Sequence, residues 1–430
     1  MNSNNISFGS ALLSSWSLLL GFGILMLGDG LQGTLLAVRA DQEGFSATVT
    51  GIVMSAFYTG FLLGSILTPR ITARVGHIRV FAAFAALASA SILVHAVFIQ
   101  IPVWLVLRFV SGFCFAGLYI VAESWLNDRA TNETRGKLLS LYMIVSYIGV
   151  GAGQLLLNLG SPTEFPLFIL TSVLISIAVV PLLLSAGSPP AHREAVSIGL
   201  LEVIKISPLG MFGMFGVGLV TATFFALGPV YGQRIGLDVK NISYFMVSAV
   251  VGTVILQAPI GALSDRFDRR IILTLVTFLT AFSAFAVPLM HSTLDSLFLF
   301  TAIFGGLAFP LYSVCIAHTN DRLDPTQMIA ASGALVLIGG LGAIAGPIMT
   351  ALLMDNFGNN AFFWTMGAVH ALLALFALYR MTRRSATPLA RQRRSAPAAA
   401  RPTDYAVDGL QQYSHDEAVG ESDGNDEDKG

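Results

Sequence analysis

The sequence predicts an all-α membrane protein in which twelve transmembrane helices form two pseudo-symmetric six-helix bundles. Of its 430 residues, 54% are hydrophobic and only 11% are charged, whereas soluble domains carry about 25% charged residues. The apolar residues come in runs of roughly 20, the length that crosses a bilayer core. A short charged loop also occurs twice at half-chain spacing, which indicates a duplicated bundle.

Most of the twelve apolar runs are bounded by Pro, Gly, Asn or a charge, as helix ends usually are. The runs show no period-two alternation, which argues against membrane strands. We expect helices over 11–38, 48–68, 78–99, 102–126, 138–159, 166–186, 207–231, 241–263, 271–289, 293–317, 328–353 and 361–381.

These spans divide the chain into five parts. They are an N-terminal segment (1–10), a first six-helix bundle (11–186), a central loop (187–206), a second bundle (207–381) and a tail (382–430). The tail is rich in Arg, Ala and Pro and then acidic, a composition that cannot bury enough apolar surface to fold. We expect it to be disordered; a docking or regulatory segment is the alternative.

The distribution of Lys and Arg predicts the orientation. With the N-terminus inside, the inner loops hold twelve of these residues and the outer loops three, namely Arg39, Arg234 and Lys240. Positive residues collect in cytoplasmic loops. We therefore expect both termini to lie in the cytoplasm and the chain to cross the inner (plasma) membrane.

The repeat extends beyond the charged loop. In that loop, Arg74 of the first copy (69–79) aligns with Arg266 of the second copy (261–270), and Gly76 aligns with Asp268. Asn-Asp-Arg follows the fourth span at 127–129 and the tenth at 320–322, an offset of 193 residues. Features in the same order at one offset indicate that both halves share an ancestor.

Cations and acids at the inner helix ends can hold neighbouring helix termini together in one state and release them in another. Positive-inside topology alone is the other reading of these charges. Glu123 lies near this face and could pair with Arg70 or Arg74. The predicted inner-face gating residues are Arg74, Gly76, Glu123, Asp128, Gly261, Asp265, Arg266, Arg269, Arg270 and Asp321.

Two ionisable residues lie deeper in the predicted bilayer, where an unpaired charge costs several kcal/mol. At ~1.5 Å per residue, Asp29 lies roughly 15 Å and Arg108 roughly 9 Å below the outer edge, so the two can be partners. An aspartate beside a cation can bind and release a proton as its exposure alternates. A permanent buried ion pair is the alternative, as is an Asp29 near the outer surface. The predicted proton-coupling and substrate residues are Asp29, Gln32, Arg108, Phe115 and Tyr119.

Several other functions lack support in the sequence. No phosphate-binding loop of the Gly-x-x-x-x-Gly-Lys-Ser/Thr type occurs, and the histidines lack metal-ligand spacing. Net charge is −1, which favours no nucleic-acid partner. We therefore expect no enzyme activity, no cofactor and no metal.

With these residues in place, the chain over about 11–381 resembles the major facilitator superfamily. Its loop signature, Gly-x-x-x-Asp-Arg-x-Gly-Arg-Arg, fits 261–270 closely and 69–79 poorly, and its fourth-span signature matches Arg108 and Gly112. The run 122–127 is similar to a YcaD-like bacterial branch. The resemblance implies that Arg108 takes part in proton transfer or substrate binding. It also implies that Glu123 or Asp128 joins an inner-face charge network.

The predicted function is secondary transport of a small organic solute by alternating access, with halves rocking about a midplane site. Few buried charges favour a neutral or weakly charged solute, and Asp29 favours proton coupling. Export of a drug or metabolite is favoured over import. The alternatives are a symporter or facilitator importing a sugar or metabolite, and a non-transporting receptor or assembly protein of the same fold. The expected partners are the solute, protons and lipid, with the protein a monomer.

Overall fold

The computed structural model describes residues 8–129, 132–184, 199–289, 293–323 and 325–383. Within these residues, twelve helices are long and apolar enough to cross a membrane, and no β-strand occurs. The predicted fold class is therefore confirmed. The predicted disorder of the tail concerns 384–430, and these residues lie outside the described part of the chain, as do 1–7.

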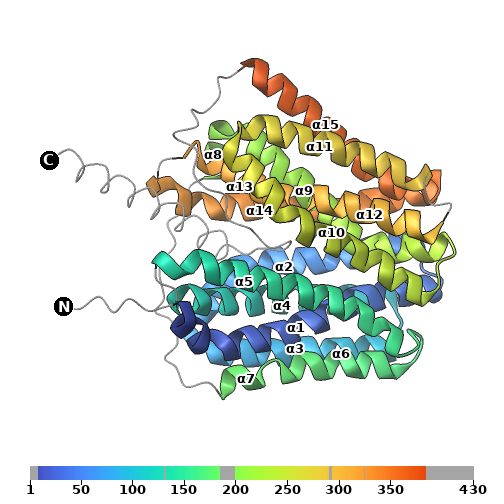
Figure 1. The fold of residues 1–430 in the computed structure, drawn as a ribbon. Helices are drawn as coiled ribbons and strands as arrows, with labels where there is room; N and C mark the ends of the chain where they lie inside the picture. The colour runs from blue at the N-terminus through green and yellow to red at the C-terminus, as the bar shows by residue number, and fades with distance from the viewer. Residues whose placement is uncertain (1–7, 130–131, 185–198, 290–292, 324, 384–430) are drawn as a thin grey trace, which may run out of the picture.

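The helices form two bundles, one for each half of the chain (Figure 1). The first half consists of α1 (Phe8–Gln42), α2 (Ala47–Val75), α3 (His77–Val97), α4 (Ile101–Arg129), α5 (Asn132–Leu155), the 3-10 turn Leu156–Leu159, α6 (Phe165–Ile177) and α7 (Val180–Leu183). The second half consists of α8 (Leu200–Ile206), α9 (Pro208–Arg234), α10 (Val239–Arg266), α11 (Arg269–Ala286), the 3-10 turn Val287–Leu289, α12 (Leu294–Ala308), α13 (Leu311–Asn320), α14 (Pro325–Phe357) and α15 (Ala361–Arg383). The short helix α8 lies inside the predicted central loop.

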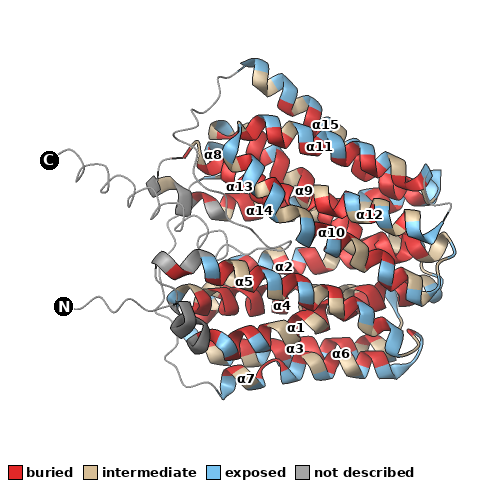
Figure 2. Ribbon diagram, in the orientation of Figure 1, coloured by how far each residue is buried: buried red, intermediate tan, exposed pale blue. Residues whose placement is uncertain are grey.

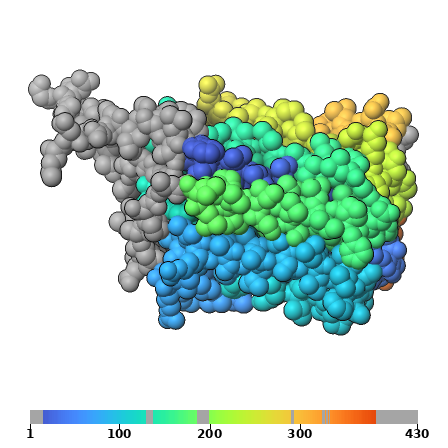
Figure 3. Space-filling model, turned by 90° about the horizontal axis from the view of Figure 1, so that it is seen from below, coloured from blue at the N-terminus to red at the C-terminus, as the bar shows by residue number. Residues whose placement is uncertain are grey.

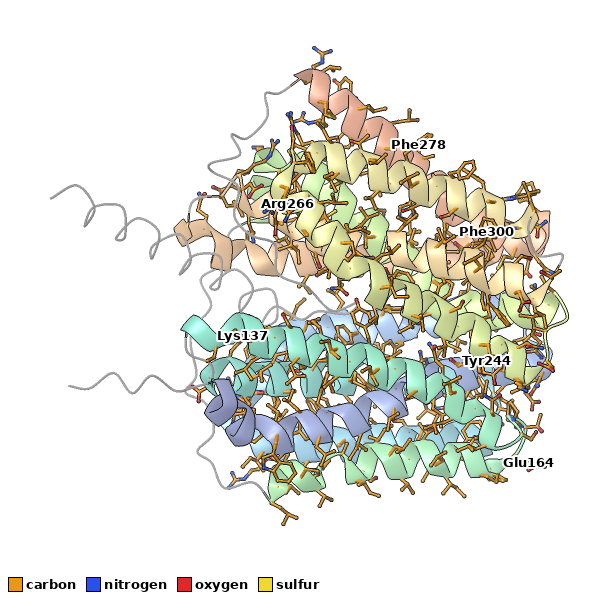
Figure 4. All side chains as sticks on the ribbon, viewed as in Figure 1. Lys137, Glu164, Tyr244, Arg266, Phe278 and Phe300 are labelled. Carbon is orange, nitrogen blue, oxygen red and sulfur yellow. The ribbon has the colours of Figure 1, made fainter. Side chains whose placement is uncertain are left out.

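The molecule has two ends, which are named here by the chain. The terminal face is the end where α1 begins and α15 ends, and Lys137 and Arg266 lie near it (Figure 4). The distal face is the opposite end, where Glu164 lies. Every membrane-length helix runs between these two faces.

Two spans that were predicted as continuous are broken in the structure. The tenth divides into α12 and α13 at Phe309–Pro310, and the sixth divides into α6 and α7 beside Pro181. Proline has no N–H to donate and its ring clashes with the carbonyl one turn earlier, so a helix kinks or breaks there. Pro69, Pro229, Pro259 and Pro347 are accommodated within longer helices.

The two halves repeat the same helix crossings. A Cβ added at Gly60 of α2 would overlap the carbonyl oxygen of Phe109 in α4, and one added at Gly252 of α10 would overlap that of Ala302 in α12. Hydrophobic burial does not drive helix association in lipid, so close backbone packing at small residues replaces it. The offset of 192 residues between the two glycines shows the repeat in three dimensions.

The aligned turn residues of the two charged loops make the same turn by different means. Gly76 connects α2 to α3 with φ of 92°, in the region that favours glycine. Asp268 connects α10 to α11 with φ of −54°, and its carboxylate accepts a hydrogen bond from the Arg270 backbone N–H as a helix N-cap. Both residues therefore keep the connection tight.

Buried residues face the interior of each half, and exposed residues lie on outward faces (Figure 2). The exposed residues include large apolar side chains such as Phe278 and Phe282, which would be an anomaly in a soluble protein. Seen from below, α3 and α6 run side by side in the wall of the first half (Figure 3). Such an apolar outer surface suits contact with lipid.

Substitution of Gly60 by Ala tests the helix crossing. An added methyl group has no room against the Phe109 carbonyl, so we expect Gly60→Ala to lower stability by about 1–3 kcal/mol, as overpacking does. Thermal unfolding in detergent micelles measures the change. Gly33→Ala is the control, because an added Cβ there meets nothing within 4 Å. Equal melting temperatures for the two variants would contradict this account of the crossing.

Candidate functional site

A narrow cavity lies between the two halves. Three walls belong to the second half (α9, α13 and α14) and one to the first (α2). The lining residues are Tyr58, Phe61, Leu62, Ser65, Gly218, Thr221, Ala222, Tyr312, Val336, Gly339, Gly340 and Ala343. None of these side chains carries a charge at neutral pH. The cavity therefore offers rings, methyl groups and hydroxyls to an occupant.

The wall from α2 differs from the wall opposite it. The α2 wall presents the rings of Tyr58 and Phe61, whereas α9 and α14 present mostly glycines and alanines, with Thr221 and Val336. The Tyr58 hydroxyl donates a hydrogen bond across the halves to the Ala222 carbonyl oxygen, at 3.3 Å. The Ser65 hydroxyl donates within its own helix to the Phe61 carbonyl, at 2.8 Å. The Tyr58 bond thus links the halves within the cavity wall.

The predicted deep charges are buried away from the cavity. Asp29 and Arg108 are 6% and 5% exposed, and neither lines the cavity. The Arg108 guanidinium lies over the ring of Phe57, 4.5 Å from its centroid. Phe57 is the neighbour in sequence of Tyr58, and the two rings meet edge to face at 5.6 Å. Arg108 therefore reaches the cavity wall through one intervening ring.

Tyr119 and Phe115, which we expected to face the cavity, are also buried behind it. The Tyr119 ring packs edge to face against Phe61 at 5.9 Å, and its hydroxyl donates to the sulfur of Met26 at 3.0 Å. Phe115 packs against Phe57 at 6.1 Å. Both side chains support the aromatic wall from behind.

Gln32 lies one turn beyond Asp29 on α1 and is 1% exposed. Neither its side-chain oxygen nor its side-chain nitrogen has a hydrogen-bond partner among the described residues. A buried polar group without a partner costs about 1–3 kcal/mol. Such unpaired groups in native structures need an explanation, such as a bound water or a functional role.

Glu123 lies among aromatic residues inside the first half. Its carboxylate is fully buried and accepts a hydrogen bond from the Tyr142 hydroxyl at 2.8 Å. The Tyr142 ring in turn stacks on Phe22 at 4.4 Å. Arg70 and Arg74, the partners that we considered for Glu123, are exposed on α2. The structure thus gives Glu123 a tyrosine of α5 as a partner.

Four of the predicted gating residues come together at the terminal face of the second half. Arg269 forms ion pairs with Asp265 at 3.1 Å and with Asp321 at 3.2 Å, and Arg270 pairs with Asp268 at 2.7 Å. Arg269 and Asp321 have side chains that are only 2% exposed. These pairs connect the α10–α11 turn to the end of α13, so they join helices within one half.

Burial alone would raise the pKa of Asp268. The hydrogen bonds that it accepts from the side chain and backbone of Arg270, together with the charge of that residue, outweigh burial and lower the pKa below its ordinary value. Asp268 therefore stays ionised at neutral pH as the cap of α11.

The other predicted gating residues are not part of this cluster. Arg74, Asp128 and Arg266 are exposed, Gly76 forms the α2–α3 turn, and Gly261 is half-buried on α10. Among the described residues, the first copy of the loop, 69–79, therefore shows no cluster of ion pairs like that of the second copy.

At the distal face, an ionic network that we did not predict joins the two halves. Arg234 at the end of α9 pairs with Asp41 at the end of α1, at 3.2 Å, and with Asp355 near the end of α14, at 3.1 Å. Asp355 also accepts hydrogen bonds from the backbone N–H groups of Ala47 and Thr48, at 3.2 and 2.8 Å. These groups form the N-terminus of α2, where a negative charge is favoured.

Further contacts join the two halves to each other between this network and the cavity. The Ser55 hydroxyl donates to the Ile344 carbonyl oxygen at 2.9 Å. The Asn158 amide donates to the Ser243 hydroxyl at 2.9 Å. A Cβ added at Gly51 would meet the Pro347 carbonyl oxygen at 2.7 Å, so α2 and α14 touch directly here. We call the ion pairs and these contacts together the distal gate.

Comparison with known proteins agrees with the fold and with the sequence resemblance. A family model described as Major Facilitator Superfamily matches residues 18–255 and 242–418. The chain is 29% identical over 375 residues to "Uncharacterized MFS-type transporter YcaD" of Escherichia fergusonii, covering 87% of this chain and 97% of that protein. It is 30% identical over 363 residues to the protein of that name in Escherichia coli strain IAI39, covering 84% and 94%.

Two solved structures have a similar fold. One is the nucleoside transporter NupG, with a TM-score of 0.73, 15% identity, and coverage of 86% of this chain and 99% of that one. The other is a bacterial homologue of the human lysosomal transporter Spinster, in an inward-facing and occupied conformation. Its TM-score is 0.69 with 14% identity, and the match covers 88% of this chain and 97% of that one.

Substitution of Asp355 by Asn tests the distal gate. It removes the charge that holds both Arg234 and the N-terminus of α2, so we expect the distal face to open more often. A buried hydrogen bond to a charged group stabilises by about 1.5–3 kcal/mol. Asp355 is partly exposed, and solvent weakens such an interaction, so we expect about a fivefold change in the ratio of open to closed molecules.

Spin labels on cysteines at Gln42 and Phe357, both exposed at the distal face, report this ratio as a distance distribution. The native Cys114 and Cys315 are free and buried and are replaced by Ala. Asp295→Asn, at an exposed carboxylate in the first turn of α12, is the control. A distribution for Asp355→Asn identical to the control would refute the gate.

Proposed function

The chain belongs to the major facilitator superfamily, and we propose that it carries an uncharged small organic solute across the membrane by alternating access, coupled to protons. It is a transporter of that family and not an enzyme. In such proteins the two halves rock about a site between them, so that the site opens to one side at a time. The cavity lies between the halves of one chain, which supports a monomer as the working unit.

The observation that carries this proposal is a cavity with a gate on one side of it. The cavity is built from both halves, and the distal gate joins α1 and α2 to α9 and α14. A rigid-body rotation of the halves would break these cross-half contacts as a group. The arrangement therefore supports a mechanism in which the distal gate opens when the site is to face that side.

The excess of Lys and Arg near the terminal face supports a cytoplasmic location for it, by the positive-inside rule. The distal face would then look outward across the plasma membrane. On this assignment the structure represents a state that is closed to the outside. Opening of the distal gate would expose the cavity outward.

The uncharged lining of the cavity supports a neutral solute. A charged solute would leave water without gaining a counter-charge from any lining residue, and burial of an unpaired charge is costly. Rings and a few hydroxyls suit a solute with apolar faces and some hydrogen-bonding groups. The small residues of α9 and α14 leave room for it opposite Tyr58 and Phe61.

Asp29 supports proton coupling because it is a buried carboxylate in the same bundle as the buried cation Arg108. A nearby positive charge favours the ionised form of a carboxylate, and loss of water favours the protonated form. Rocking of the halves that changes the hydration of Asp29 would also change the proton affinity of its carboxylate. Proton binding would then be linked to the side from which the cavity is open. Export driven by proton entry is the direction that we favour.

Substitution of Asp29 by Asn tests the coupling. We reconstitute the protein in liposomes that enclose a pH-sensitive dye and add a panel of nucleosides, monosaccharides and uncharged aromatic drugs. We expect at least one solute to drive a lumenal pH change with the wild-type protein, and Asp29→Asn to abolish that change because the side chain can no longer bind a proton.

Asp295→Asn is the control and should retain the signal, since that carboxylate is exposed. Coupled transport that is unchanged in Asp29→Asn would rule out the proposed role of Asp29. Transport of no solute by the wild-type protein across the panel would instead favour a receptor or assembly protein of the same fold.

A further inference from the structure

One aromatic ring connects the deep cation to the cavity. Phe57 lies under the Arg108 guanidinium, with 4.5 Å between the guanidinium carbon and the ring centroid. The same ring contacts the two aromatic residues that α2 contributes to the cavity wall, Tyr58 at 5.6 Å and Phe61 at 6.2 Å. Phe57 itself is 1% exposed and does not line the cavity.

The backbone at Phe57 lies against α4. A Cβ added at Gly112 would overlap the Phe57 carbonyl oxygen, so the two helix backbones are in direct contact at this point. Gly112 lies one turn after Arg108 on α4. The contact between the helices therefore places the Phe57 ring beside the Arg108 guanidinium.

The second half of the chain shows that the crossing does not need this ring. The contact between Gly112 and Phe57 recurs as the contact between Gly305 and Ala249, where an added Cβ would meet the Ala249 carbonyl oxygen at 2.5 Å. The residue 193 positions after Arg108 is Thr301. Where the cation is absent, the ring is absent too, although the helices cross in the same way. Packing of the crossing therefore does not explain Phe57.

We propose that Phe57 is a positioning residue that transmits the state of the Asp29–Arg108 site to the substrate cavity. This inference rests on the proposed proton-coupled transport and names the physical link within it. An arginine over an aromatic face is held by a cation–π attraction, which strengthens as water is excluded.

In this proposal Asp29, buried in the same half, is the partner of Arg108. When Asp29 gains or loses a proton, its attraction for the Arg108 guanidinium changes, and so does the strength of the contact between the guanidinium and the Phe57 ring. The ring then presses on Tyr58 and Phe61 to a different degree. Tyr58 holds the cross-half hydrogen bond to Ala222, so this change alters a contact between the halves. In this way proton binding in the first half biases the closed state of the whole molecule.

The test needs no known solute and uses the distal-face spin labels at Gln42 and Phe357. We first compare the wild-type protein with Asp29→Asn, which mimics the protonated carboxylate, and measure the change in the open-to-closed ratio. We then repeat the comparison in a Phe57→Leu background, which keeps an apolar side chain and removes the aromatic face. We expect the effect of Asp29→Asn to shrink roughly fivefold, the factor that an ordinary cation–π contact is worth.

Phe224→Leu is the matched control. Phe224 is fully buried in an aromatic cluster of the second half, with Phe245 and Phe304 as neighbours. We expect the effect of Asp29→Asn to survive in that background. A series of fluorinated phenylalanines at position 57 keeps the ring shape and weakens its π face stepwise, so the effect should fall stepwise if the cation–π contact carries it.

The outcomes separate the two proposals. If Asp29→Asn leaves the distances of the wild-type protein unchanged, coupling through Asp29 fails. If it changes them equally in the wild-type and Phe57→Leu backgrounds, the role of Phe57 fails while coupling stands. If Phe57→Leu does not fold, the fluorinated series decides, and an effect that is insensitive to fluorination overturns the proposal.

Discussion

The close approach of helix backbones at glycine is the constraint on which the rest of the structure depends. In lipid, apolar side chains gain little by leaving one apolar surface for another, so helices associate where small residues let backbones touch. Gly60 and Gly112 bring α2 and α4 into such contact, as Gly252 and Gly305 do for α10 and α12. These crossings hold each half together. The cavity and the distal gate lie between the halves, where we propose that movement occurs.

The two halves share this scaffold but divide the chemistry. Asp29 in α1 and Arg108 in α4 occupy positions whose counterparts in the second half, 192 and 193 residues later, are Thr221 and Thr301. Thr221 lines the cavity, whereas Asp29 does not. The first half thus holds the deep charges and the second half contributes most of the cavity wall. The ionic cluster of the terminal face, around Arg269, belongs to the second half as well.

The fold could be predicted from the sequence because its causes are local. Runs of apolar residues of fixed length indicate spans, and the repeated loop indicates duplication. The site could be predicted only in part. Buried charges such as Asp29 are conspicuous in an apolar run. The helix face that lines a cavity depends instead on how each whole helix is rotated in the bundle. We expected Tyr119 to line the cavity, but its counterpart in the second half, Tyr312, lines it instead. The distal network joins Asp41, Arg234 and Asp355. In the sequence these residues look like ordinary charges at helix ends, and only the packing of the two halves brings them together.

Asp355 holds the first half by the main-chain N–H groups of Ala47 and Thr48 as well as by the Thr48 side chain. Two of these donors are encoded in the backbone, which every residue except proline supplies. An alanine scan along α2 would therefore leave both main-chain donors in place. The vulnerable member is the single carboxylate on the other side, which also pairs with Arg234. Loss of that one side chain would remove contacts from both halves of the molecule at once.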